Sequence, residues 1–254
     1  MVSIQNLNKA FGRNQVLDNL SLQINQKGVT AILGPNGSGK TTLIKSILGM
    51  TIPDKGTITI NGRDIKKDVL YRENLDYLPQ IADFPDNLKV KELIKMIKDL
   101  RNKPARDETL IRFFGLEPFL DKKLNTLSGG TRQKVNLILA FMFDSPLMIL
   151  DEPSSGLDPV SLIRLKEWIN MEKAQGKIIL VTSHIMSFVE EIAENIAFLL
   201  DGKIYFNGSL SQLRTKTGQE DLEHAIASLL LPSTPLRDRG KPPLRSCPAP
   251  NLKL

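Results

Sequence analysis

The chain has 254 residues, of which 41% are hydrophobic and 24% are charged, a balance that is ordinary for a globular protein and sufficient for a full α/β core. No apolar run approaches the ~20 residues that a membrane-spanning helix needs, and residues 1–6 have neither the basic nor the apolar stretch of a secretion signal. The single cysteine, Cys247, excludes an internal disulfide.

The net charge of +6 is concentrated near the end of the sequence. From Arg237 onward there are five basic residues and one acidic residue, so the rest of the chain is close to neutral and a nucleic-acid partner is not expected. Six of the fifteen prolines lie in residues 231–254, which cannot sustain a helix or a central strand. We therefore predict a folded domain at residues 1–230 and a Pro-rich, basic, disordered tail at residues 231–254. A tail that binds an anionic partner is the alternative.

The first strands are predicted from an alternation of apolar and polar residues. We expect an antiparallel layer that begins with two strands. The apolar positions of the first are Val2, Ile4 and Leu7, and those of the second are Leu20, Leu22 and Ile24. Residues 57–62 continue this layer.

A phosphate-binding loop follows the apolar run at residues 29–33. Its sequence, GPNGSGKTT, fits G-x-x-x-x-G-K-[ST] and precedes a helix-like stretch at residues 43–48. Such a turn directs backbone N–H groups and the positive end of a helix dipole at a polyphosphate. We expect Lys40 to reach the terminal phosphates and the Thr41 hydroxyl to bind Mg²⁺. The alternative is a chance Gly-rich turn. The residues concerned are Gly34, Pro35, Asn36, Gly37, Ser38, Gly39, Lys40, Thr41 and Thr42.

The pattern becomes helical after Gln80. Apolar residues recur at helical spacing from Val90 to Leu100, and a second helix is expected from Asp107 to Phe114, ending at Gly115. A third helix opens with the Ser/Gly-rich sequence LSGGTRQK at residues 127–134, and its N-terminus could also bind an anion. We predict an inserted helical subdomain at about residues 82–142.

Two short apolar runs, residues 147–150 and 178–181, predict parallel strands that are covered on both faces. Asp151 and Glu152 follow the first run. A carboxylate at the C-terminal end of such a strand, beside a phosphate loop, is placed to hold Mg²⁺, and we assign that role to Asp151. Glu152 could polarise a water for attack on a γ-phosphate. The alternative is an acidic pair that closes a strand at the surface.

The last elements follow from local signals. Asp158 and Pro159 predict the start of a helix that runs towards Gly176, and Asp201-Gly202 predicts a tight hairpin. His184 closes the strand at 178–181, and in isolation it is more typical of a hydrogen-bonded strand-end residue than of a catalytic one.

In this order, the motifs resemble those of the nucleotide-binding subunits of ATP-binding-cassette (ABC) transporters, over about residues 1–210. The matching segments are the Walker A loop (34–42), Gln80, LSGG (127–130), LMILDEP (147–153), SGLD (155–158) and His184. The resemblance implies an ATPase with a P-loop NTPase (RecA-like) α/β core, an antiparallel β layer and an inserted helical subdomain. ATP and Mg²⁺ are the implied cofactors.

The same resemblance implies roles for further residues. Two copies would close head to tail, with ATP held between the P-loop of one and Ser128, Gly129 and Gly130 of the other. Gln80 would contact Mg²⁺ and the attacking water, His184 would hold the γ-phosphate, and Phe11 would stack on adenine. The stretch after Gln80, including residues 83–85, would face an integral membrane permease. The chain would then lie in the cytoplasm, on the inner face of the cell membrane.

Two positions depart from the usual family pattern. Phe11 stands where many members have tyrosine, which preserves the π-face, and Thr131 stands where glutamine is common. Within the family, a short single-cassette chain with a hairpin followed by residues 208–213 resembles the ATPases of the ABC-2 export type. The whole chain resembles the NosF-like ATPases associated with copper-site maturation of nitrous oxide reductase. An ABC ATPase that acts on an iron–sulfur scaffold or another non-membrane partner, and an amino-acid or metal importer, are the alternatives.

Overall fold

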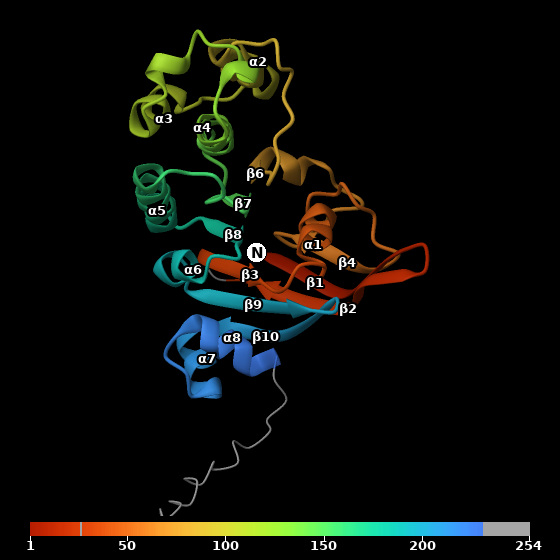
Figure 1. Ribbon diagram of the computed structural model, residues 1–254. Helices are drawn as coiled ribbons and strands as arrows, with labels where there is room; N and C mark the ends of the chain where they lie inside the picture. Colours follow the sequence, from red (N-terminus) through yellow and green to blue (C-terminus); the bar gives the residue numbers. More distant parts are fainter. Residues whose placement is uncertain (26, 231–254) are drawn as a thin grey trace, which may run out of the picture.

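Two β-sheets with helices packed around them make up residues 1–25 and 27–230, the part of the chain that this computed structural model describes (Figure 1). The predicted tail at residues 231–254, with Cys247, lies outside the described residues. Among the helices of residues 1–25 and 27–230, none has the length and hydrophobicity of a transmembrane span.

The first sheet is the antiparallel layer, with four strands in the order β2-β1-β4-β5. Its strands are β1 (Val2–Phe11), β2 (Asn14–Ile24), β4 (Lys55–Ile60) and β5 (Arg63–Asp64). The alternating apolar positions of β1 and β2 are buried, as predicted: Val2, Ile4, Leu7, Leu20, Leu22 and Ile24 are each at most 4% exposed.

The second sheet has six strands in the order β10-β9-β3-β8-β7-β6. Its strands are β3 (Gly28–Leu33), β6 (Leu75–Leu78), β7 (Leu147–Asp151), β8 (Ile178–Thr182), β9 (Asn195–Leu200) and β10 (Lys203–Ser209). All neighbours are parallel except β9 and β10, which form the hairpin predicted at Asp201-Gly202. Both hairpin residues have positive φ, as a tight two-residue turn requires.

Both faces of the parallel strands are covered. Successive side chains point to opposite faces, so Ile149 and Leu180 pack in one core with helix α1 (Lys40–Ile47) and the antiparallel sheet. Leu150 and Val181 pack in the other core with the remaining helices. These observations confirm the predicted P-loop α/β core with its antiparallel layer.

Three helices gather at one end of the molecule, beyond β6 and β7 (Figure 1). They are α2 (Val90–Arg101), α3 (Asp107–Phe114) and α4 (Gly129–Phe141), with 3₁₀ turns η1 (Leu70–Asn74), η2 (Glu117–Phe119) and η3 (Leu124–Thr126) nearby in the sequence. Gly115 ends α3 in the left-handed conformation, as predicted. Leu100 is the exception to the predicted apolar face of α2, because it is 75% exposed. We propose that this group is a subdomain with limits near residues 82–142.

The other helices are α5 (Pro159–Ala174), α6 (Met186–Ile192), α7 (Leu210–Thr217) and α8 (Leu222–Leu230). Asp158 caps α5, because its carboxylate accepts a hydrogen bond from the Ser161 backbone N–H at 2.9 Å. Helices α7 and α8 lie beside β10 (Figure 1). The adjacent parallel strands β3, β8 and β7 all end on the same side of the sheet, and the candidate site lies at these C-terminal ends.

Candidate nucleotide-binding site

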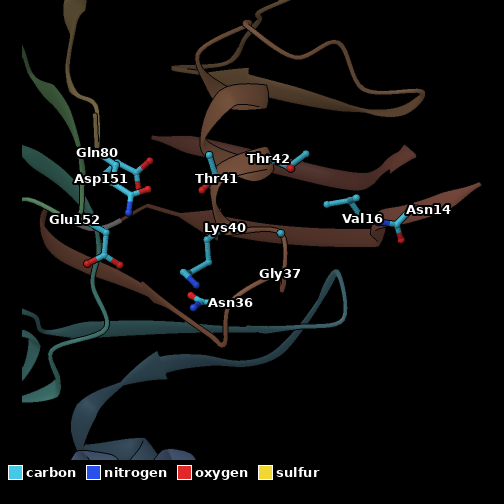
Figure 2. Close-up of a pocket in the computed structure, with 11 residues that line it drawn as sticks. Asn14, Val16, Asn36, Gly37, Lys40, Thr41, Thr42, Gln80, Asp151 and Glu152 are labelled. Atoms are coloured by element: carbon cyan, nitrogen blue, oxygen red, sulfur yellow. The ribbon is translucent and has the colours of Figure 1, made fainter. Parts of the chain in front are cut away.

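A cavity of about 300 Å³ lies where β3 and β7 end, and residues from four separate segments line it (Figure 2). The segments are the start of β2, the loop between β3 and α1, the residue pair after β6, and the end of β7. The lining residues are Asn14, Val16, Asn36, Gly37, Gly39, Lys40, Thr41, Thr42, Gln80, Asp151 and Glu152. The structure therefore brings most of the residues singled out from the sequence into one cavity.

The glycines of the loop are set by close backbone packing. A Cβ at Gly34 would lie 2.1 Å from the Leu199 carbonyl oxygen, and a Cβ at Gly39 would lie 2.9 Å from the Val16 carbonyl oxygen. Gly39 also has a φ of 106°, in the region that favours glycine, and it forms the N-cap of α1. The loop therefore delivers the unpaired N–H groups of the first helical turn to the cavity, where they favour an anion.

Lys40 begins α1 and directs its ammonium group towards the cavity (Figure 2). Its Nζ donates hydrogen bonds to the carbonyl oxygens of Gly34 at 2.7 Å and Pro35 at 3.1 Å. Burial lowers the pKa of Lys40, and the carboxylates of Glu152 and Asp151 partly oppose this shift. A cation held at a helix N-terminus between a Gly-rich loop and two acids is suited to pairing with a phosphate.

Asp151 is the last residue of β7, and Glu152 follows it directly. Both residues are buried, with 3% and 7% of their surfaces exposed. Glu152 has a φ of 51°, which is uncommon for a residue other than glycine, so the chain turns sharply at this point. The turn aims the two successive carboxylates into the same cavity (Figure 2).

Thr182, the last residue of β8, contacts both acids. Its Oγ1 donates a hydrogen bond to Oδ1 of Asp151 at 2.5 Å and accepts one from the Glu152 backbone N–H at 3.0 Å. The sequence analysis did not single out this threonine. It could have been found in the sequence as the hydroxyl residue that ends an apolar strand two positions before His184.

His184 lies at the same edge of the sheet, on the segment after β8. Its Nδ1 is 2.8 Å from Oε2 of Glu152, and 69% of its side chain is exposed. With Nδ1–H as the donor, Oε2 of Glu152 accepts this hydrogen bond. His184 does not line the cavity directly but holds a residue that does.

Gln80 comes two residues after β6 and completes the wall beside Asp151 (Figure 2). Tyr77 lies on β6, where burial, with a smaller contribution from the Asp151 carboxylate, raises the pKa of its phenol to about 12. The tyrosine therefore stays neutral next to the acidic end of β7.

The start of β2 lies across the phosphate loop from Asp151 and Glu152 (Figure 2), and Phe11 precedes it at the end of β1. Phe11 is 53% exposed, pairs in register with Asn14, and has the Lys9 ammonium 5.2 Å from its ring centroid. Asn14 and Val16 line the cavity although the sequence analysis did not select them. They could have been found as the residues that follow the turn after Phe11.

Ser128, Gly129 and Gly130 lie outside this cavity, at the N-terminus of α4. Ser128 caps the helix by accepting from the Thr131 N–H at 3.3 Å. The following residues attach this helix start to the loop after Glu152: Gln133 Nε2 donates to the Pro153 carbonyl at 3.1 Å, and Lys134 pairs with Asp158 at 3.0 Å. The exposed Ser128 and Gly129 and the half-buried Gly130 therefore begin a helix that is attached to the loop after Glu152, outside the cavity of their own chain.

Comparisons with known proteins agree with this geometry. A family profile described as ABC transporter matches residues 17–155. The chain is 33% identical to the uncharacterized ABC transporter ATP-binding protein YhaQ of Bacillus subtilis (strain 168), covering 87% of this chain and 76% of that protein. It is 30% identical to the lantibiotic transport ATP-binding protein SrtF of Streptococcus pyogenes, covering 91% and 98%.

Solved structures give the same result. An ATP-binding subunit of an ABC transporter has a TM-score of 0.84 at 29% identity, covering 91% of this chain and all of that one. A dimeric ATP-binding cassette in a post-hydrolysis state, bound to ADP and Pi, has a TM-score of 0.72 at 24% identity, covering 83% and 99%, which supports the shared fold.

Proposed function

This chain belongs to the ABC transporter family of ATP-binding proteins, and on that basis we propose that it hydrolyses ATP to power export through a separate membrane permease. The observation that carries the proposal is the cavity in which the phosphate loop, Gln80, Asp151 and Glu152 meet. Similar proteins named for lantibiotic transport and Nod factor export favour the export direction. The closer likeness to NosF-like ATPases stays a prediction.

In this function the loop and Lys40 bind the phosphates of ATP. The backbone N–H groups at the start of α1 and the Lys40 ammonium stabilise negative charge on the transferred phosphoryl group, and such positioning is the main contribution of proteins to this reaction. We assign adenine to Phe11, because its half-exposed ring is paired in register with Asn14 at the edge of the cavity.

The residues present also fit a magnesium ion. The Thr41 hydroxyl, the Gln80 amide and the Asp151 carboxylate line one cavity, and hard oxygen ligands of this kind suit Mg²⁺ that is shared with nucleotide phosphates. When bound, the ion would neutralise charge on the β- and γ-phosphates. Asp151 is the one carboxylate of this set; it is buried, and its Oδ1 accepts a hydrogen bond from Thr182 Oγ1 at 2.5 Å.

Glu152 and His184 form the catalytic pair of the proposal. Glu152 polarises and orients the attacking water, and His184 Nδ1 holds the carboxylate at 2.8 Å. The other nitrogen of this exposed ring, Nε2, would donate to the γ-phosphate from the imidazolium form, in which both ring nitrogens carry a proton. One histidine thereby connects the phosphate with the group that prepares the water.

The second ATP-binding surface comes from another copy of the chain. Because residues 128–130 lie outside the cavity of their own chain, they serve the ATP of a partner copy in a head-to-tail dimer. The chain shares its fold with cassettes solved as dimers, which supports this arrangement.

The permease is assigned to a mostly apolar groove of about 410 Å³ between β6, α2 and α4. Phe84, from the stretch predicted to face a membrane subunit, lines it together with the exposed Leu100. The other lining residues are Leu75, Asp76, Tyr77, Pro79, Ile97, Arg101, Asn136, Leu139 and Phe143. The site of action is then the cytoplasmic face of the membrane.

Affinity purification of the tagged chain from membranes tests this function. A Glu152→Gln variant loaded with ATP would be compared with the unchanged chain, and co-purified proteins would be identified by mass spectrometry. We expect a multi-spanning permease. Recovery of an iron–sulfur scaffold or another non-membrane protein in its place would contradict the transporter role and favour the alternative.

A further inference from the structure

Thr182 lies between the two parts of the proposed ATP site. Its strand, β8, is the neighbour of both β3, which leads into the phosphate loop, and β7, which ends at Asp151. Thr182 is in register with Ile32 on one side and with Asp151 on the other. Its side chain is fully buried, so its hydroxyl must find its partners inside the protein.

The partners are the two acidic residues of the site. The hydroxyl hydrogen goes to Oδ1 of Asp151 at 2.5 Å, and a hydroxyl lone pair accepts the Glu152 N–H at 3.0 Å. A hydroxyl can donate once and accept twice, so one group serves both contacts. At 2.5 Å the bond to Asp151 is a short O–H···O bond, so the hydroxyl lies close against the carboxylate.

The contact to Glu152 acts on a strained piece of backbone. A φ of 51° is unfavourable for glutamate and persists only where surrounding contacts hold it. The Glu152 N–H is directed at both the hydroxyl and the backbone carbonyl of Thr182, at 3.0 and 3.2 Å. These bonds set the direction in which the Glu152 side chain leaves the strand.

We propose that Thr182 is a positioning residue for ATP hydrolysis, because its hydroxyl orients the carboxylate of Asp151 towards Mg²⁺ and fixes the backbone turn that presents Glu152 to the attacking water. This inference rests on the roles of Asp151 and Glu152 in the proposed function. Thr182 touches neither nucleotide nor metal in this scheme and acts through the two acids.

The next residue, Ser183, shows what a buried hydroxyl with a purely structural role looks like at this position. Ser183 is also buried, but its Oγ accepts from the Ile185 backbone N–H at 3.1 Å and, within the described part of the chain, bonds to neither acid. It shapes the turn into α6, as such side chains commonly do. A buried hydroxyl at the end of β8 therefore does not by itself contact Asp151 and Glu152, whereas that of Thr182 does.

The test replaces the hydroxyl without changing the shape of the side chain. Thr182→Val removes the two hydrogen bonds of the hydroxyl and leaves only the bond from the Glu152 N–H to the backbone carbonyl of residue 182. Thr182→Ser keeps the hydroxyl, and Thr30→Val makes the same replacement at a buried threonine of β3 outside the cavity. Groups that orient a ligand of a metal typically contribute 10- to 100-fold to affinity or rate. We expect Thr182→Val to lower kcat by roughly tenfold to a hundredfold.

Calorimetry supplies a readout that does not depend on turnover. ATP affinity without Mg²⁺ should match the unchanged chain in every variant, whereas Thr182→Val should need on the order of tenfold more Mg²⁺ for tight ATP binding. Thr182→Ser and Thr30→Val should behave as the unchanged chain. If Thr182→Val does not fold, Thr182→Ala compared with Thr182→Ser carries the same test.

Two results would overturn the inference: an unchanged Mg²⁺ requirement and kcat in Thr182→Val, or equal losses in Thr182→Ser and Thr182→Val at equal thermal stability. Asp151→Asn separates this failure from failure of the proposed function. If Asp151→Asn loses its Mg²⁺ response and Thr182→Val does not, only the role of Thr182 is wrong. If the unchanged chain does not hydrolyse ATP, the proposed function itself is wrong.

Discussion

Nδ1 of His184 lies 2.8 Å from Oε2 of Glu152, so the exposed histidine holds the buried carboxylate on which the proposed chemistry depends. The two residues come from neighbouring parallel strands, because Glu152 follows β7 and His184 follows β8. Their contact is a consequence of the sheet, in which the carboxyl ends of parallel strands meet at one edge.

Replacement of this histidine tests the contact. We expect His184→Ala to retain ATP binding and to lose ~10²–10³-fold in turnover, because Glu152 loses its partner and the γ-phosphate loses a donor. His224 is the matched control: it is also exposed and paired with a carboxylate, Asp221 at 2.9 Å, but it lies on α8, outside the cavity. Steady-state ATPase assays would check the result. Equal activity in both variants would remove His184 from the mechanism.

Replacement of Lys40 should weaken the binding of ATP itself, and not only the rate of its hydrolysis. In Lys40→Ala the cavity loses the ammonium that faces the phosphates, so we predict a weakening of ATP affinity of at least roughly tenfold, as expected for a charge-assisted contact. Lys45→Ala, at an exposed position of the same helix, should bind ATP normally. Calorimetric titration measures both variants. Equal affinities would contradict the phosphate-loop assignment.

The lowered pKa of Lys40 predicts a pH effect on affinity. Because burial disfavours the charged ammonium, Lys40 loses its proton at a lower pH than an ordinary lysine does. ATP affinity should therefore decline on the alkaline side before the ordinary lysine range near 10.4 is reached. Lys40→Arg, which stays charged, should remove this decline. A decline that is equal in both proteins would assign it to another group.

Asp158 should stabilise the fold in a pH-dependent way. Its hydrogen bonds with Ser161 and Lys134 hold the pKa of the carboxyl well below its usual range. A group of this kind contributes stability that is present above the unfolded pKa and is lost as pH falls towards the folded pKa. Asp158→Ala should lower the free energy of unfolding by about 1 kcal/mol at neutral pH, with a smaller difference in acid. Asp158→Asn retains the helix cap and should lose less. Urea denaturation at several pH values would show whether the difference is instead constant.

Leu100 tests the assignment of the permease groove. Leu100→Asp places a charge in the mostly apolar groove and should reduce co-purification of the permease by on the order of tenfold or more, while the ATPase activity of the isolated chain stays unchanged. Met171→Asp, at an exposed apolar position on α5, is the control and should leave association intact. Equal recovery from both variants would place the permease elsewhere.

The local elements were predictable from the sequence because local signals determine them. Alternating apolar residues predict β1 and β2, and the structure confirms both strands. It also confirms that α3 ends at Gly115 and that the hairpin at Asp201 has positive φ values. Leu100 was expected on the buried face of α2 but is exposed, because residue spacing gives a helix its periodicity and does not show where its packing partners end.

The connections within the site were less predictable. Thr182 and Asp151 are 31 positions apart in the sequence, and only the order and register of β7 and β8 bring the hydroxyl to the carboxylate. Asn14 and Val16 reach the cavity because the start of β2 packs against the phosphate loop, where a Cβ at Gly39 would lie 2.9 Å from the Val16 carbonyl oxygen. Contacts of this kind depend on tertiary packing, which motif spacing does not encode.

The most direct test of the account is the rate of ATP hydrolysis by Glu152→Gln, measured beside the unchanged chain and beside Glu223→Gln, a change in the exposed face of α8. The account predicts that Glu152→Gln binds ATP with unchanged affinity, loses at least ~10²-fold in turnover and accumulates as an ATP-bound dimer in light scattering. Hydrolysis by Glu152→Gln at the rate of the unchanged chain would contradict the central claim that Glu152 prepares the attacking water.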